Sequence, residues 1–180
     1  MRMPTLLAGH VDGVARALRD GGGVPYEQFR PEFTSAMDGM SRGLMDSQLL
    51  DGILPLATDL PGRLATGIRV ADVGCGTGVM FELIRDRGLN VDYLGIDVTE
   101  KFLEVAQSLY PQDRHRFRRM SLYETKKLRR KFDVVICRHV LEHLPDYVPA
   151  IQSLYSCAAK KLILVFYLPP RPLGSKRKLD

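Results

Sequence analysis

Hydrophobic positions along the chain change their spacing near Gly67. Before that point they recur at helical intervals, and no stretch alternates as a strand does. The apolar residues of the first segment share one helical face: Leu6, Leu7, Val11, Val14 and Leu18. Glycines at Gly21 to Gly23 predict its end, because glycine tolerates left-handed C-cap geometry. A second helical region is predicted to start near Tyr26 and to be interrupted by Pro31, and a third follows Ser41 up to Pro55. The N-terminal third thus favours helices without strands.

From Gly67 onward, short apolar runs alternate with helical segments. The predicted strands are IRVADV, DYLGID, HRFRRM, FDVVIC and LILVFYL. The predicted helices lie around Phe81 to Arg87, Lys101 to Leu109 and Tyr147 to Ala158. This alternation predicts right-handed crossovers and a doubly wound α/β sheet of five mainly parallel strands. The first, fourth and fifth runs are almost wholly apolar, as is typical of strands covered by helices on both faces.

Length, composition and cysteine content restrict the number of domains, membrane association and the state of the thiols. With 180 residues, 45% of them hydrophobic, the chain fits one α/β domain with a sizeable core. No run approaches the roughly 20 apolar residues that cross a bilayer, and the N-terminus has too short an apolar core for a signal peptide. We therefore expect a cytoplasmic protein without membrane partners. Its three cysteines, Cys75, Cys137 and Cys157, are odd in number and far apart, so reduced thiols are expected.

The formal net charge of +5 has a local origin. Residues 114–131, RHRFRRMSLYETKKLRRK, are dense in arginine and lysine, and Glu124 is their only acid. Such a patch attracts anions. A solvated strand edge and loop is favoured over a nucleic-acid interface, which stays a second interpretation.

Three glycines at alternate positions follow the first predicted strand: Gly74, Gly76 and Gly78, in VADVGCGTG. In a doubly wound sheet, ligands bind beyond the carboxyl ends of the strands, where this turn lies. A Cβ at Gly74 or Gly76 would hold a ligand off the backbone, and the next helix presents amide donors. The pattern predicts a binding loop rather than only a tight turn.

Asp97 ends the next predicted strand, 19 residues after Gly78. An acid at about 20 residues commonly binds ribose hydroxyls, and its two oxygens suit a vicinal diol. The alternative role, capping the following helix, fits Thr99 better. The order GCGTG differs from the GxGxxG of dinucleotide sites, so the sequence predicts an adenosine ligand other than a dinucleotide.

Three motifs together resemble the class I S-adenosylmethionine-dependent methyltransferases. Asp72 to Gly78 has the form D-x-G-x-G-x-G of their first motif, and LGIDVTEKFLEVAQ resembles their second. FDVVICRHVLEHLPD is similar to the fourth-strand motif of the small-molecule branch. The resemblance covers about residues 67–168 and implies a Rossmann-like sheet of order 3-2-1-4-5 with S-adenosylmethionine as cofactor.

The resemblance also implies a set of cofactor-binding residues. They are Asp72, Gly74, Cys75, Gly76, Gly78, Asp97, Val98, Ser121, Leu122 and Arg138. Asp72 orients the glycine turn, Asp97 binds the ribose diol and Val98 packs on adenine. Ser121 stands where related enzymes place an acid that reaches adenine, with Glu124 as the alternative.

Methyl transfer to an oxygen or nitrogen needs in-line geometry, and a base only where the acceptor loses a proton. His139 and His143 are the candidate bases, although VLEH also serves as helix scaffolding in these enzymes. HVLEH also matches the inverted zinc-peptidase motif. This alternative is less favoured, because the match is only five letters long and follows an apolar strand in a chain that already has two cofactor motifs. A nucleic-acid amino methyltransferase is disfavoured, because CRHV stands in place of D/N-P-P-Y/F. We expect a small-molecule acceptor of unknown identity.

We divide the chain into an N-terminal helical cap (1–66), the methyltransferase core (67–168) and a basic tail (169–180). Related enzymes continue past the fifth strand with an antiparallel pair of strands, for which this tail offers no match. We expect the fifth-strand edge to be covered by the N-terminal helices, by the tail, or by another subunit in a homo-oligomer or complex. A catalytically weak, partner-dependent protein is the alternative to an enzyme.

Overall fold

The computed structural model describes residues 10–21, 39 and 66–166, and the chain forms two compact units, Met1–Ile53 and Leu54–Asp180. In the first unit, α2 (Val11–Asp20) is followed by Gly21, whose φ is 75°. Its apolar residues Val11, Val14 and Leu18 are exposed. The helices predicted from Tyr26 and Ser41, and the basic tail, lie outside the described residues.

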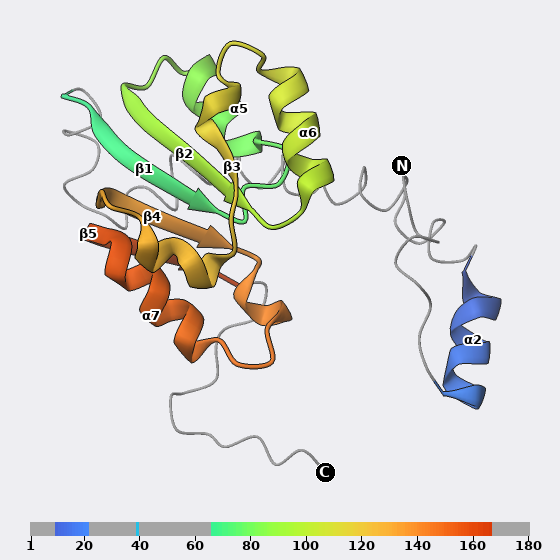
Figure 1. Ribbon diagram of the computed structural model, residues 1–180. Coiled ribbons are helices and arrows are strands. Elements are labelled where there is room, and N and C mark those ends of the chain that lie inside the picture. Colours follow the sequence, from blue (N-terminus) through green and yellow to red (C-terminus); the bar gives the residue numbers. More distant parts are fainter. Residues whose placement is uncertain (1–9, 22–38, 40–65, 167–180) are drawn as a thin grey trace. The chain divides into compact units, whose positions relative to one another are not determined.

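The second unit contains a five-stranded sheet (Figure 1). Its strands are β1 (Ile68–Val73), β2 (Val91–Asp97), β3 (Phe117–Arg119), β4 (Phe132–Arg138) and β5 (Ala158–Val165). They pair in the order β3-β2-β1-β4-β5, and every pairing is parallel. The predicted doubly wound sheet of order 3-2-1-4-5 is therefore confirmed.

Helices cover both faces of this sheet. The α-helices are α5 (Val79–Asp86), α6 (Glu100–Leu109) and α7 (Val148–Cys157), and the short 3₁₀ helices are η4 (Arg114–Arg116), η5 (Leu122–Lys127) and η6 (Leu141–His143). Because strand side chains alternate between faces, Leu94 packs in the cluster under α7, whereas Tyr93 contacts Phe81 of α5. Among the described residues, no helix is long and apolar enough to span a membrane.

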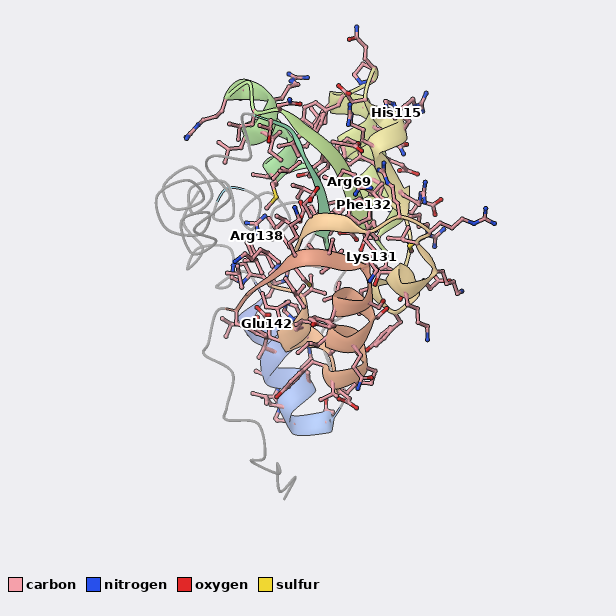
Figure 2. The ribbon with its side chains drawn as sticks, turned by 90° about the vertical axis from the view of Figure 1, so that its left-hand side faces the viewer. Arg69, His115, Lys131, Phe132, Arg138 and Glu142 are labelled. Carbon is pink, nitrogen blue, oxygen red and sulfur yellow. The ribbon has the colours of Figure 1, made fainter. Side chains whose placement is uncertain are left out.

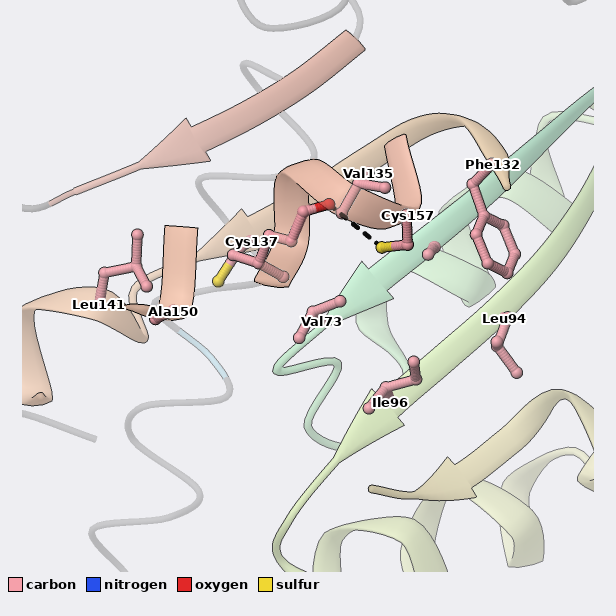
Figure 3. Packing of buried hydrophobic residues seen from close by; sticks show 11 residues of the cluster. Val73, Leu94, Ile96, Phe132, Val135, Cys137, Leu141, Ala150 and Cys157 are labelled. Atoms are coloured by element: carbon pink, nitrogen blue, oxygen red, sulfur yellow. Dashed lines mark hydrogen bonds between the residues drawn. The ribbon is translucent and has the colours of Figure 1, made fainter. Parts of the chain in front are cut away.

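The face under α7 holds the main hydrophobic cluster (Figure 3). Strands β1, β2 and β4 contribute most of its fully buried residues, and α7 adds Ala150, Leu154 and Cys157. On the other face four aromatic rings lie edge-on, tilted or stacked at 5.0 to 6.0 Å between centroids: Phe81, Tyr93, Tyr110 and Phe117. These two layers fix the carboxyl ends of β1, β2 and β4, where the candidate site lies.

Two elements differ most from the sequence prediction. β3 is only three residues long, because Arg114–Arg116 forms a 3₁₀ turn where a strand was expected from His115. β5 begins at Ala158, directly after α7, rather than at Leu162. Its first residues include exposed Ala159 and Lys160, so their polar pattern hid the strand start.

Candidate cofactor and active site

The glycine turn joins β1 to α5 and is tied to β2. Gly74, Gly76 and Gly78 have φ of 83°, 55° and 88°, in the left-handed region that favours glycine. The N–H groups of Gly74 and Cys75 donate to the carbonyl of Ile96, at 2.7 and 3.1 Å. The turn is therefore held at the carboxyl end of the sheet, as predicted for a binding loop.

The three glycines meet different surroundings. A Cβ on Gly74 would collide with Cγ2 of Val140, from the loop after β4. A Cβ on Gly78 would lie 3.0 Å from the Phe117 ring. A Cβ on Gly76 would have no described atom within 4 Å. Gly74 was expected to be glycine because a ligand needs the room, but packing against Val140 already excludes a side chain there. Gly76 differs, because its backbone faces open space.

Asp97 connects the glycine turn with α6. Its Oδ2 accepts a hydrogen bond from Gly76 N–H at 2.9 Å, and its Oδ1 accepts one from Thr99 N–H at 2.8 Å. Thr99 is the N-cap residue of α6, as expected, although its side chain makes no capping hydrogen bond. Each carboxylate oxygen retains a second lone pair that can accept from a diol.

Asp72 is buried at the end of β1 and accepts a hydrogen bond from the Tyr93 hydroxyl at 2.8 Å. Burial raises the pKa of Asp72, while the positive charge of Arg138 and the Tyr93 hydrogen bond lower it in part. Burial also raises the pKa of Tyr93 far above its usual value, so the phenol stays protonated as the donor. Tyr93 was missed in the sequence, because an aromatic residue within a strand is indistinguishable from ordinary core.

The predicted contacts to adenine come from Val98 and from Ser121, with Glu124 as its alternative, and Leu122 belongs to the same predicted cofactor set. Val98 follows Asp97 and is 65% exposed, which leaves its side chain free for contact. Ser121 is the N-cap of η5, where its Oγ accepts from Tyr123 N–H at 3.4 Å. Glu124 completes this capping box by accepting from Ser121 N–H at 3.3 Å, and it also pairs with Lys127. Leu122 packs against the main hydrophobic cluster.

His139 and Glu142 form a close pair after β4. The Nδ1 of His139 lies 3.3 Å from Oε1 of Glu142. Backbone N–H of His139 donates to the Val165 carbonyl at 2.9 Å, and its φ of 54° is rare for a residue with a side chain. Burial lowers the pKa of His139, opposed by Glu142 and reinforced by the charges of Arg138 and His143. The imidazole is thus held neutral near pH 7, whereas His143 is exposed.

The zinc-peptidase interpretation of HVLEH needs both histidines on one face of an α-helix. Here His139 has a left-handed backbone, and Leu141–His143 forms a single 3₁₀ turn. Among the described residues, no group of three or more histidine, cysteine or acidic side chains is arranged to hold a metal ion. The geometry does not support that alternative.

The three cysteines are free thiols, and all are buried. Burial raises the pKa of Cys137 to about 12 and that of Cys75 well above its usual value. The Sγ of Cys75 packs against β2, since a Cβ on Gly95 would lie 3.0 Å from it. Cys75 therefore contributes to the site through its backbone, and its buried thiol does not act as a nucleophile.

Comparison with known proteins accounts for this arrangement. The model of a family described as "Methyltransferase domain" matches residues 42–180. The chain belongs to this methyltransferase family. The resemblance indicated by the three motifs is confirmed, and with it the Rossmann-like class of the sheet.

Relatives and solved structures agree with the family. The ubiquinone biosynthesis O-methyltransferase of Leptothrix cholodnii is 37% identical over 48% of this chain and 38% of its own length. That of Actinobacillus pleuropneumoniae is 33% identical over 62% of this chain and 51% of its own. The chain thus spans about half or less of these relatives. Magnesium protoporphyrin IX methyltransferase from Synechocystis, solved with bound S-adenosylmethionine, matches 91% of this chain and 76% of its own at 26% identity, with a TM-score of 0.54.

Proposed function

We propose that this chain binds S-adenosylmethionine and transfers its methyl group to a hydroxyl oxygen of a small organic acceptor. The family supports methyl transfer, and the relatives named O-methyltransferases support an oxygen acceptor. The loop, ribose-binding acid and base expected from the sequence lie at one edge of the sheet, at the ends of β1, β2 and β4.

The Gly76–Asp97 pair carries this proposal. Gly76 leaves an open surface where a side chain would stand, and the Asp97 carboxylate lies at hydrogen-bonding distance from its amide. A nucleoside placed there would face exposed Val98 and would offer its ribose diol to Asp97. Val98, Ser121 and Leu122 would surround the base, and the methionine part would continue along the glycine turn.

Bound S-adenosylmethionine supplies an electrophilic methyl group on a sulfonium. In the proposed reaction His139 removes the proton of the acceptor hydroxyl, so that the oxygen attacks as its charge develops. Glu142 orients the ring through Nδ1, which directs Nε2 toward the acceptor, as an acid does for histidine in hydrolase triads. The lowered pKa keeps the imidazole unprotonated at neutral pH. His143 takes no direct part in this scheme.

Calorimetry tests the first half of the proposal. S-adenosylmethionine and S-adenosylhomocysteine are expected to bind in the micromolar range and NAD not to bind, because GCGTG lacks the dinucleotide spacing. A panel of phenols, catechols and other hydroxylated metabolites, scored by release of S-adenosylhomocysteine, tests the second half. Tighter binding of NAD would overturn the cofactor, and turnover only with RNA or protein would overturn the small acceptor.

Asp97 provides the variant for this test. Asp97→Asn keeps the size of the side chain and weakens the charge-assisted contact to the diol, which is worth about 1.5–3 kcal/mol. S-adenosylhomocysteine affinity should fall by roughly 10- to 100-fold, as this range implies. Asp146→Asn, at an exposed position two residues before α7, is the matched control and should leave the affinity unchanged.

A further inference from the structure

Arg138 is the last residue of β4 and lies at the same edge as the glycine turn. Ile136 pairs with Asp72, and side chains two residues apart share a face, so Arg138 lies on the Asp72 side of the sheet. Figure 2 shows Arg138 and Glu142 at one side of the ribbon, with Lys131 and His115 toward the other. The guanidinium therefore belongs to the candidate site and not to the basic stretch that precedes β4.

The guanidinium of Arg138 has hydrogen-bonding capacity that the described residues do not use. Its Nε and Nη1 are buried, and neither has a hydrogen-bond partner among these residues. Arginine stays protonated in proteins, so burial cannot be relieved by loss of the charge. A buried donor without an acceptor costs about 1–3 kcal/mol, more when it is charged, so the unpaired guanidinium needs an explanation such as a catalytic role or a bound ion or ligand.

The charge of Arg138 is balanced only in part. Its electrostatic influence reaches the Asp72 carboxyl, whose described hydrogen bond comes from Tyr93 instead. The buried Asp72 carboxyl makes no hydrogen bond to the Nε or Nη1 of Arg138, so it does not satisfy these donors. The Nε–H of an arginine lies parallel to one N–H of Nη2, and this pair matches a carboxylate in bidentate geometry, so a carboxylate on that side would satisfy the unpaired Nε of Arg138.

We infer that Arg138 forms a carboxylate-binding subsite at the end of β4, resting on the proposed function for its place beside the cofactor. Neighbouring strands are about 4.8 Å apart, so β2 and β4 lie roughly 10 Å apart on either side of β1. A nucleoside whose ribose is held by Asp97 on β2 would extend its amino-acid end across the glycine turn toward β4. The cofactor's methionine carboxylate is thus the first source, and an acid group on the acceptor is the second.

The two sources are separated by binding measurements on the full chain. Wild type is titrated with S-adenosylhomocysteine and with its decarboxylated form, which keeps the amine and loses the anion. If the cofactor is the source, wild type prefers the carboxylated ligand by roughly 10- to 100-fold, the range of a charge-assisted contact, and Arg138→Met removes that preference. Arg138→Lys should keep part of it, because a point charge replaces the fork.

A second titration tests the acceptor as source. Salicylate, a phenol with a carboxylate, and phenol, its uncharged match, are titrated with S-adenosylhomocysteine present. Preference for salicylate in wild type that Arg138→Met abolishes would assign the subsite to the acceptor. Arg138→Met with both preferences unchanged would overturn the inference, as would wild type without either preference. Thermal unfolding without ligand checks folding, and Arg138→Gln, which keeps donors without the charge, replaces Arg138→Met if that variant fails to fold.

Failure of this inference and failure of the proposed function give different results. Wild type that binds S-adenosylhomocysteine and its decarboxylated form equally, and shows no salicylate preference, contradicts the subsite alone. Wild type that binds neither nucleoside contradicts the proposed function. In that case salicylate and phenol, titrated without nucleoside, still decide whether Arg138 binds a carboxylate.

Discussion

At the scale of single residues, alanine variants of Gly74 and Gly76 test two different roles: packing against the protein for Gly74 and ligand binding for Gly76. Both have positive φ, so an alanine at either position carries backbone strain of about 1–2 kcal/mol. Gly74→Ala adds a collision with Val140, a β-branched side chain with few rotamers, for a further 1–3 kcal/mol or so. Thermal unfolding should therefore show a larger loss for Gly74→Ala, and calorimetry should show a loss of S-adenosylhomocysteine affinity for folded Gly76→Ala.

A double-mutant cycle checks the cause. Val140→Ala removes the methyl group that Gly74→Ala would strike, so the double variant should be more stable than the sum of the two single losses predicts. Additive losses would contradict the Val140 contact. Unchanged ligand affinity in Gly76→Ala would contradict the open surface as a binding surface.

The contact between His139 and Glu142 leads to a prediction about the pH at which the His139 ring titrates. The pKa of His139 is lowered by burial, so its ring should titrate below the ordinary value of about 6.5 in NMR spectra of the ring carbons. Glu142 raises this pKa, so Glu142→Gln should move the titration to still lower pH. His143 lowers it, so His143→Asn should move it slightly upward or leave it in place. His139 titrating above 6.5 in wild type would contradict the buried neutral base.

At the scale of elements, Ser121 and Glu124 begin η5 with a capping box. Ser121→Ala removes the acceptor for Tyr123 N–H and should lower the free energy of unfolding by about 1 kcal/mol. Denaturant unfolding measures this loss, and Ser156→Ala, near the end of α7, is the comparison. If Ser121 also contacts adenine, S-adenosylhomocysteine affinity falls in the same variant; a loss of affinity without loss of stability would contradict the capping role.

Elements with a strong pattern were predictable, and those set by tertiary contact were not. IRVADV and FDVVIC match β1 and β4 closely because runs buried on both faces leave few alternatives. β3 was overestimated because it pairs with β2 over only Phe117 to Arg119. The place of Asp97 in the site was predictable from its spacing after the glycine turn. Its hydrogen bonds to Gly76 and Thr99 were not, because they depend on how that turn folds back on β2. Gly74's need for space depends on Val140, 66 positions further along the chain, which no local pattern reveals.

At the scale of the whole sheet, the two ends of the basic stretch lie at the amino ends of the strands, opposite the candidate site. Arg116 directly precedes β3, and Arg130 lies just before β4. Both pair with Asp92 near the start of β2, at 3.6 and 2.9 Å. Because all strands are parallel, these residues mark the amino ends of the strands, while Gly76 and Asp97 mark the carboxyl ends. A polyanion on this edge would be held away from the proposed methyl donor.

This separation predicts that nucleic acid and cofactor do not compete. Single-stranded RNA attracted to the basic residues at the amino ends of the strands would bind through its phosphates, so its affinity should fall steeply as salt rises. The affinity for S-adenosylhomocysteine, compared at one salt concentration, should be the same with and without RNA. Calorimetric titration of S-adenosylhomocysteine at low and moderate salt, with and without RNA, measures this. Arg130→Gln, which leaves Asp92 paired with Arg116, should weaken RNA binding and leave the nucleoside unaffected. Competition between RNA and S-adenosylhomocysteine, or methyl transfer to RNA, would mean that the polyanion reaches the carboxyl edge, and would favour the nucleic-acid interpretation over a small acceptor.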